Sequence, residues 1–376
     1  MNILVIGNGF DIAHHLQTSY MEFLEFTESF HSIRKTPHIM QSGGLACIEK
    51  PKWRYIDNLI WENEEYADEF WNMTKDNFWI KYFSKKAGKI GVKWIDFESE
   101  ISRLVRLIEN DVKEYDKALY DISDDDAKGT FKEVAQGIEK YTDLFERMLV
   151  DLRKLIRSFE IYVSVYINSE EIEVRIPEIE EIDADKVLSF NYTNTYERLY
   201  ATEKLVEICY VHGKADRDNR YGKDTTNIIL GIDEYLPDDE KNVKIEHIGF
   251  KKYYQRIIKG TGNRYLSWID DIRIAWDKRN ASKIQPLNFS TGKMFVKKQS
   301  VNVYSNLYIF GHSLGKTDGD ILKKLICNDN VKTTIFYHEN KSLKEQVANL
   351  VQIIGQDELI KRTGGQTQTI WFKKQK

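Results

Sequence analysis

Five short apolar runs, set far apart along the chain, limit the fold more than any other feature of this sequence. We predict buried strands at residues 2–6, 186–190, 207–211, 307–310 and 333–337. The first four runs are almost continuously apolar instead of alternating, which is typical of parallel strands covered on both faces. The pattern therefore predicts an α/β fold built on a Rossmann-type parallel sheet.

The spacing of the runs also predicts how the chain is divided. Residues 1–20 and 186–340 are expected to form a Rossmann-type nucleotide-binding core, and residues 21–185 a long helical insertion. One apolar stripe in that insertion, at helical spacing, consists of Leu144, Met148, Leu152, Leu155 and Phe159. Residues 235–305 are expected to form a second insertion, and residues 341–376 a helix and strand that complete the core. Runs 227–230 and 368–372 are further strand candidates.

Net charge, cysteine content and hydropathy argue against several classes of protein. The net charge of −4 gives no reason to expect non-specific attraction to nucleic acid. The three cysteines lie far apart, so we expect neither a disulfide framework nor a structural zinc site. No apolar stretch approaches the roughly 20 residues that span a bilayer. We therefore expect a cytoplasmic protein with no membrane contact.

Each of the first four predicted strands is followed at once by a cluster of polar residues or glycines. The clusters are Gly7-Asn8-Gly9-Phe10-Asp11, Asn191-Tyr192-Thr193-Asn194-Thr195, His212-Gly213-Lys214 and Gly311-His312-Ser313-Leu314-Gly315-Lys316-Thr317-Asp318. In an open parallel sheet the carboxyl ends of the strands share one edge, and ligands bind in the crevice there. Four clusters far apart in sequence are therefore expected to converge on one site.

The first cluster resembles a nucleotide-binding turn with one unusual residue. Gly7 and Gly9 would let a ligand approach the backbone closely, but Ile12 stands where the dinucleotide fingerprint has its third glycine. Asp11 would repel a phosphate and suits a ribose or base donor, or a metal ion, better. The alternative is that Asp11 is an ordinary helix N-cap.

The second and third clusters supply candidates for catalysis. Asn191 and Asn194 are placed to hydrogen-bond an amide or a ribose, although asparagine also favours turns for its own reasons. His212 is the best candidate for a general acid or base, because its unperturbed pKa lies near neutrality. The alternative for His212 is a purely structural histidine.

The fourth cluster matches two catalytic motifs incompletely. Residues 311–315 fit G-x-S-x-G, the nucleophile elbow of hydrolases, with Ser313 as nucleophile and His338 as a distant base, but no well-placed acid precedes His338. Gly315, Lys316 and Thr317 end like a P-loop whose earlier glycine is one residue too close. What remains is a turn in which Thr317 or Asp318 caps a helix over 321–325 and faces a ligand.

One further cluster, in the sequence WIDFESEI (94–101), lies in the helical insertion. We interpret Asp96, Glu98 and Glu100 as a solvated or capping face, with Glu98 as an alternative acid that reaches over the sheet edge.

Several separated motifs together resemble one known family. GNGFD followed by TSY, then W-x-D-F-E, FNYTNTY, VHG and FGHSLGKTD occur in this order over nearly the whole chain. They resemble the bacteriophage abortive infection AbiH family. The resemblance implies a role in antiviral defence, in which an infected bacterium arrests or dies before phage release.

A more distant similarity, to sirtuins and sirtuin-like NAD-consuming domains, implies a chemistry. In that pattern the first turn cradles NAD, the asparagine lies near the nicotinamide ribose, the histidine is the base and the Gly-x-Ser turn holds the other ribose. The residues that carry it here are Gly7, Gly9, Asn191, His212, Gly311 and Ser313. The zinc module of sirtuins is absent, and Thr193 stands where the pattern has an aspartate.

The resulting hypothesis is an anti-phage effector that binds NAD, or a related nucleotide, and hydrolyses its nicotinamide–ribose bond. The residues assigned to catalysis are His212, Asn191 and Asp11, and those assigned to the nucleotide are Gly7, Asn8, Gly9, Thr193, Gly311, Ser313 and Asp318. A phage trigger, a companion defence protein and a homo-oligomer are candidate partners.

Two alternatives stay open. The first is a nuclease in which Asp11, Glu98 and Asp318 bind Mg²⁺ and the pairs Lys251-Lys252 and Lys297-Lys298 approach nucleic acid. The second is a nucleotide sensor without catalytic activity.

Overall fold

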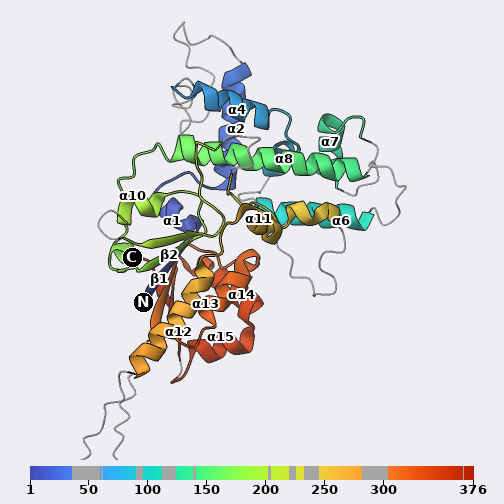
Figure 1. Ribbon diagram of the computed structural model, residues 1–376. Coiled ribbons are helices and arrows are strands. Elements are labelled where there is room, and N and C mark those ends of the chain that lie inside the picture. Colours follow the sequence, from blue (N-terminus) through green and yellow to red (C-terminus); the bar gives the residue numbers. More distant parts are fainter. Residues whose placement is uncertain are drawn as a thin grey trace, which may run out of the picture.

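A parallel sheet forms the centre of the molecule (Figure 1). The computed structural model describes residues 1–35, 60, 62–89, 96–111, 124–138, 141–201, 205–219, 226–232, 245–281, 304–366 and 368–376. The strands are β1 (Asn2–Ile6), β2 (Lys186–Ser189), β3 (Glu207–Tyr210), β4 (Ser305–Phe310), β5 (Val331–Tyr337) and β6 (Ile370–Lys374). They pair in the order β3-β2-β1-β4-β5-β6, and every pair is parallel. This is the strand order of dinucleotide-binding α/β proteins, so the predicted fold class is confirmed.

The apolar strand sequences follow from burial on both faces of the sheet. In β1, Ile3 and Val5 belong to the hydrophobic cluster on one face, and Leu4 and Ile6 to the cluster on the other. All four are at most 2% exposed. Each strand must therefore carry apolar side chains at consecutive positions, which is why the runs do not alternate.

Different helices cover the two faces. The face of Leu4 and Ile6 packs against α1 (Asn8–Ala13), α9 (Pro177–Glu180) and α10 (Thr195–Tyr200). The face of Ile3 and Val5 packs against α12 (Tyr265–Ala281), α13 (Gly319–Ile326), α14 (Asn340–Ile354) and α15 (Gln356–Thr363). In Figure 1 these last four helices lie on the lower side of the molecule. The sheet is thus the middle layer of three.

The chain between β1 and β2 is mostly helical in its described part. It contains α2 (Tyr20–Lys35), α4 (Glu64–Thr74), α5 (Phe78–Ala87), α6 (Phe97–Asp111), α7 (Asp125–Val134), α8 (Tyr141–Ile161) and the π-helix η4 (Tyr162–Ile167). These helices share an aromatic-rich core of their own, into which the predicted stripe of α8 is buried. In Figure 1, α8 runs across the top of the sheet domain. None of the helices in the described ranges is long and apolar enough to cross a membrane.

The second predicted insertion contributes η5 (Ile245–Phe250), α11 (Lys252–Lys259) and α12. Run 227–230 is not a strand, and this prediction was wrong. Ile228, Ile229 and Leu230 are fully buried, but their backbone bonds go elsewhere. Ile229 N donates to His212 O, and both backbone groups of Leu230 bond to the Gln255 side chain. Burial, and not strand pairing, therefore explains the apolar run. The last strand begins two residues later than predicted, at Ile370.

Candidate functional site

The turns after β1 and β4 touch each other, and their glycines make this possible. Gly9 N donates to Gly311 O over 2.8 Å, and Gly7 N donates to Phe310 O over 3.2 Å. A Cβ atom on Gly9 would lie 2.8 Å from the Gly311 backbone. Gly311 has a φ of +65°, and a Cβ there would lie 2.1 Å from Phe10 N. These glycines are therefore required for the contact between the two turns, and the Gly7 and Gly9 amides are used within the protein.

Two other residues assigned to the nucleotide lie at the rim of this contact. Asn8 and Ser313 are exposed. Asn8 Oδ1 accepts a hydrogen bond from Thr18 Oγ1 over 2.6 Å. The Ser313 carbonyl accepts one from Asn349 Nδ2 over 2.8 Å. Both are therefore fixed in place, and their proposed contacts with a nucleotide stay predictions.

Asp11 is a buried carboxylate inside α1 and not its N-cap, a position that Gly7 occupies. Asp11 is 1% exposed, and its Oδ2 accepts a hydrogen bond of 2.8 Å from Thr193 Oγ1. Its Oδ1 atom has no hydrogen-bond partner. Burial raises the pKa of Asp11 to about 6, although the polar side chains of Thr193, Thr195 and Asn191 beside it pull it back down. The pairing of Thr193 with Asp11 joins the first two predicted clusters.

Because its pKa is raised, ionised Asp11 destabilises the folded protein near neutral pH. The unfolded chain releases this proton near pH 3.8 and the folded chain near pH 6, so stability falls as pH rises between these values. We expect Asp11→Asn, which keeps an acceptor for Thr193, to raise the free energy of unfolding at pH 7 by up to about 3 kcal/mol. Urea unfolding between pH 4 and 7 measures this, with the exposed Asp218→Asn as control. An unchanged pH dependence in Asp11→Asn would contradict the assignment.

Asn191 is the least satisfied buried side chain at the sheet edge. It is 4% exposed, and within the described ranges neither its Oδ1 nor its Nδ2 atom makes a hydrogen bond of good geometry. The Oδ1 atom of Asn194, at the start of α10, is also buried and unpaired. Buried polar groups are normally hydrogen-bonded, and exceptions need an explanation. Amides left open in this way suit a polar ligand.

His212 and the fourth cluster come together as predicted. His212 Nε2 lies 3.0 Å from Asp318 Oδ1, and His312 Nε2 lies 3.5 Å from Asp318 Oδ2. The Leu314 amide donates to His312 Nδ1, which places the proton of neutral His312 on the nitrogen that faces Asp318. Burial raises the pKa of Asp318, but Lys252 and the two histidines hold it well below its usual range. Asp318 is thus an ionised carboxylate beside two imidazoles.

Asp318 does not act as the helix cap that the sequence suggests. It occupies the N-cap position of α13, yet its side chain makes no capping hydrogen bond. The carboxylate faces the two histidines and Lys252 instead, because these charged and polar partners are buried beside it. Its assignment to the ligand site is compatible with this geometry.

Lys252 and Glu98 complete the cluster from the two insertions. Lys252, at the start of α11, is 0% exposed. Its Nζ atom lies 2.6 Å from Glu98 Oε2 and 3.4 Å from Asp318 Oδ1. Glu98 comes from α6 and is 8% exposed, so it is the acid that reaches over the sheet edge and not part of a solvated face. Asp96 does cap α6, because it accepts a hydrogen bond from the Glu98 amide.

This arrangement does not fit the residues assigned in the nuclease hypothesis at two points. Lys251 and Lys252 are buried and do not form a surface for nucleic acid. The ammonium of Lys252 lies between Glu98 and Asp318, where a cation shared by these carboxylates would sit, while Asp11 bonds to Thr193. Across the described ranges, no group of three or more His, Cys, Asp or Glu side chains is arranged to hold a metal ion. The proposed donor set does not fit Mg²⁺, and Lys297-Lys298 lie outside the described residues.

The hydrolase alternative also fails on local geometry. A nucleophile elbow strains the backbone at the serine itself. Here the positive φ angles fall on Gly311 and Leu314, at +65° and +58°, and not on Ser313. His338, the only base that the sequence offered, is exposed beyond the end of β5.

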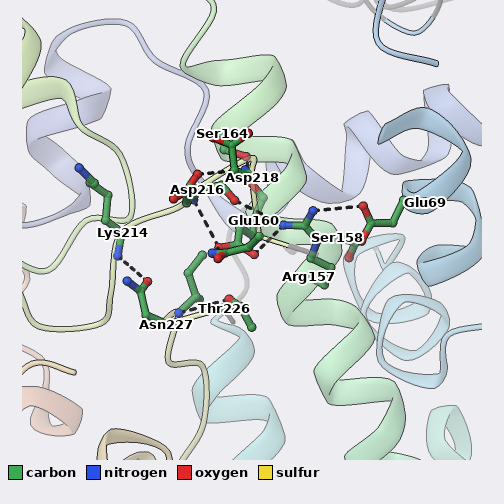
Figure 2. Close-up of polar contacts among 12 residues, drawn as sticks. Glu69, Arg157, Ser158, Glu160, Ser164, Lys214, Asp216, Asp218, Thr226 and Asn227 are labelled. Atoms are coloured by element: carbon green, nitrogen blue, oxygen red, sulfur yellow. Dashed lines mark hydrogen bonds and ion pairs between the residues drawn. The ribbon is translucent and has the colours of Figure 1, made fainter. Parts of the chain in front are cut away.

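A buried ion network fixes the segment that follows His212 (Figure 2). Arg157 of α8 is 1% exposed and contacts Glu69 Oε1 at 2.9 Å and Glu160 Oε2 at 2.8 Å. Glu160 Oε1 accepts hydrogen bonds from the Asp216 amide and from Asn219 Nδ2. The helical insertion therefore holds the loop that begins at His212.

Burial and charge determine the protonation of His212. Burial lowers the pKa of His212 to about 4, Lys252 and Arg256 lower it too, and Asp318 raises it. The imidazole is therefore neutral near pH 7 and able to accept a proton. Tyr192 and Phe190 pack against its ring, with centroids 6.1 and 5.5 Å away. A neutral histidine oriented by an ionised carboxylate is the arrangement of a general base.

Comparison with known proteins gives one result. Neither the curated proteins nor the solved structures include a match to this chain. The family model described as bacteriophage abortive infection AbiH matches residues 3–338, which span the sheet from β1 to the end of β5 and both insertions. The match therefore includes every residue of the site described above, and the chain belongs to the bacteriophage abortive infection AbiH family.

Proposed function

We propose that this chain acts in abortive infection by hydrolysing the nicotinamide–ribose bond of NAD, or of a closely related nucleotide, at the carboxyl edge of its sheet. One observation carries the proposal: the neutral His212, oriented by Asp318, lies at the same edge as the unpaired amide of Asn191. The strand order supports it, because ligands of such sheets bind where the order reverses, here between β1 and β4.

The reaction assigns a role to each group. Water attacks C1′ of the nicotinamide ribose as the C1′–N bond breaks, and the pyridinium leaves with the bonding electron pair as neutral nicotinamide. His212 accepts a proton from the attacking water, so the products are nicotinamide, ADP-ribose and a proton. Asp318 stabilises the imidazolium that forms. Asn191 hydrogen-bonds the ribose hydroxyls, and the Asp11 carboxylate stabilises positive charge that develops on the sugar.

The test uses Asn191, whose amide makes no hydrogen bond of good geometry to the described residues. We expect Asn191→Ala to keep the stability of the wild type within about 1 kcal/mol while it lowers nicotinamide release from NAD by about 10-fold or more. Chromatographic assay of nicotinamide measures turnover, on protein purified from phage-challenged cells. Asn330→Ala, at the opposite edge of the sheet, is the matched control.

Three results separate the hypotheses. Release of nicotinamide that requires Asn191 supports the proposal. Binding of NAD with no product would indicate a nucleotide sensor instead. If Asn191→Ala releases nicotinamide at the wild-type rate, the proposed role of Asn191 is wrong.

A further inference from the structure

Arg256 is a buried guanidinium with two donors that no group of the described residues accepts. It is 8% exposed, and neither Nε nor Nη2 has a hydrogen-bond partner in the described part of the chain. Its Nη1 atom makes one long contact, 3.5 Å to Asp320 Oδ2. A buried arginine normally satisfies its fork of donors, since an unpaired charged group is costly. The open donors therefore indicate a place for an anion.

The position of Arg256 relates it to the catalytic cluster. Arg256 follows Lys252 by four residues on α11, so the two side chains leave the same face of the helix about 6 Å apart. Both reach the start of α13: Lys252 contacts Asp318 and Arg256 contacts Asp320. His212 lies 3.0 Å from Asp318 at the first of these contacts. Arg256 is therefore one helical turn from Lys252, which shares the Asp318 carboxylate with the general base.

The glycine amides of the first turn are already used within the protein, and this bears on which anion Arg256 binds. In a dinucleotide site the amides of the glycine turn bind the phosphates. Here Gly7 N and Gly9 N donate to the β4 turn, and Lys252 is held by Glu98 and Asp318. A phosphate beside this edge must be bound by other donors. The planar fork of arginine, open at Nε and Nη2, fits two phosphate oxygens.

We propose that Arg256 is the phosphate-binding residue of this site, so that the substrate is a phosphorylated nucleotide and not a free nucleoside. The inference rests on the proposed function for the identity of the sugar and base, and on the structure alone for the anion. Asp320, whose side chain is 47% exposed, occupies one edge of the guanidinium and moves aside when phosphate binds.

The experiment is calorimetric binding of ADP-ribose, inorganic phosphate and nicotinamide riboside to the full-length chain. We expect Arg256→Gln to weaken ADP-ribose binding by about 10- to 100-fold and to leave nicotinamide riboside, which has no phosphate, within about twofold. Asp320→Asn should tighten ADP-ribose binding, because it removes the competing carboxylate. Arg273→Gln, an exposed arginine of α12, is the matched control and should change neither ligand.

The possible outcomes test the phosphate subsite at Arg256 and the hydrolysis of NAD separately. Binding of ADP-ribose that depends on Arg256, without hydrolysis of NAD, supports the subsite and refutes the reaction. Hydrolysis of NAD with an unchanged KM in Arg256→Gln refutes the subsite and leaves the reaction. A wild type that binds neither ADP-ribose nor phosphate overturns the subsite. If ADP-ribose binds no more tightly than inorganic phosphate, the assignment of the subsite to a nucleotide is wrong.

Discussion

Replacing His212 by alanine is expected to lower kcat for nicotinamide release from NAD by about 10²- to 10⁴-fold, the usual contribution of a general base. The expectation follows from the neutral imidazole, whose pKa burial lowers to about 4, and from the Asp318 carboxylate 3.0 Å from its Nε2 atom. Binding of ADP-ribose should persist in this variant, because the proposed phosphate contact is made by Arg256.

Two variants make this result specific. His338→Ala removes an exposed histidine that the hydrolase alternative would need, and it should keep full turnover. His212→Gln fills most of the same volume, so a loss in both His212 variants cannot be attributed to a cavity. Turnover within about threefold of the wild type in His212→Ala would refute the base assignment.

Replacing Arg157 by methionine is expected to destabilise the protein by about 3–5 kcal/mol, because it leaves the carboxylates of Glu69 and Glu160 without their shared cation. Glu160 is 0% exposed, so water cannot replace the guanidinium. Thermal and urea unfolding measure the loss. Arg153→Met, an exposed arginine on the same helix, is the matched control and should change stability by less than about 0.5 kcal/mol.

A second substitution identifies the cause. Glu160→Gln added to Arg157→Met removes one uncompensated charge and should recover part of the lost stability. The same network holds Asp216 and Asn219, so hydrogen exchange should also increase in the segment after His212. A loss below about 1 kcal/mol in Arg157→Met would mean that the network contributes little.

The sheet and the convergence of four clusters could be predicted because both follow from local patterns. Strands buried on both faces are apolar at consecutive positions, and parallel strands bring their carboxyl ends to one edge. Asp11, Asn191, His212 and Asp318 could therefore be placed together from their positions after strands. The same argument wrongly predicted a strand at residues 227–230. This segment is apolar because it is buried, and the Gln255 side chain takes up the backbone groups of Leu230 that a strand would pair.

Of the contributions of the two insertions, only the reach of Glu98 over the sheet edge was among the sequence-based alternatives, and its pairing with Lys252 could not be predicted. Lys252 appears in the sequence as half of a basic pair, and Glu98 as one acid among three. Only the docking of α6 and α11 over the sheet edge makes Lys252 and Glu98 a buried pair 2.6 Å apart. The same holds for Arg256, whose open donors are a consequence of burial and not of sequence pattern. One local signal existed: Lys252 and Arg256 are four residues apart, the spacing of one helix face.

The raised pKa of Asp11 supports its place in the proposed site. Burial in α1 raises this pKa to about 6, although asparagine at this position would preserve the bond to Thr193 without the ionisable group. Proteins keep such groups where activity requires the charge, and perturbed ionisation is concentrated at functional sites.

The most direct test of the account is a mass balance of NAD in phage-challenged cells that express the chain. Mass spectrometry would follow NAD, nicotinamide and ADP-ribose in the wild type and in the His212→Ala and Asn191→Ala variants. We expect NAD to fall in cells with the wild type while nicotinamide and ADP-ribose rise in equal amounts. In cells with either variant, all three levels should stay unchanged. Constant NAD during a growth arrest caused by the wild type would contradict the account.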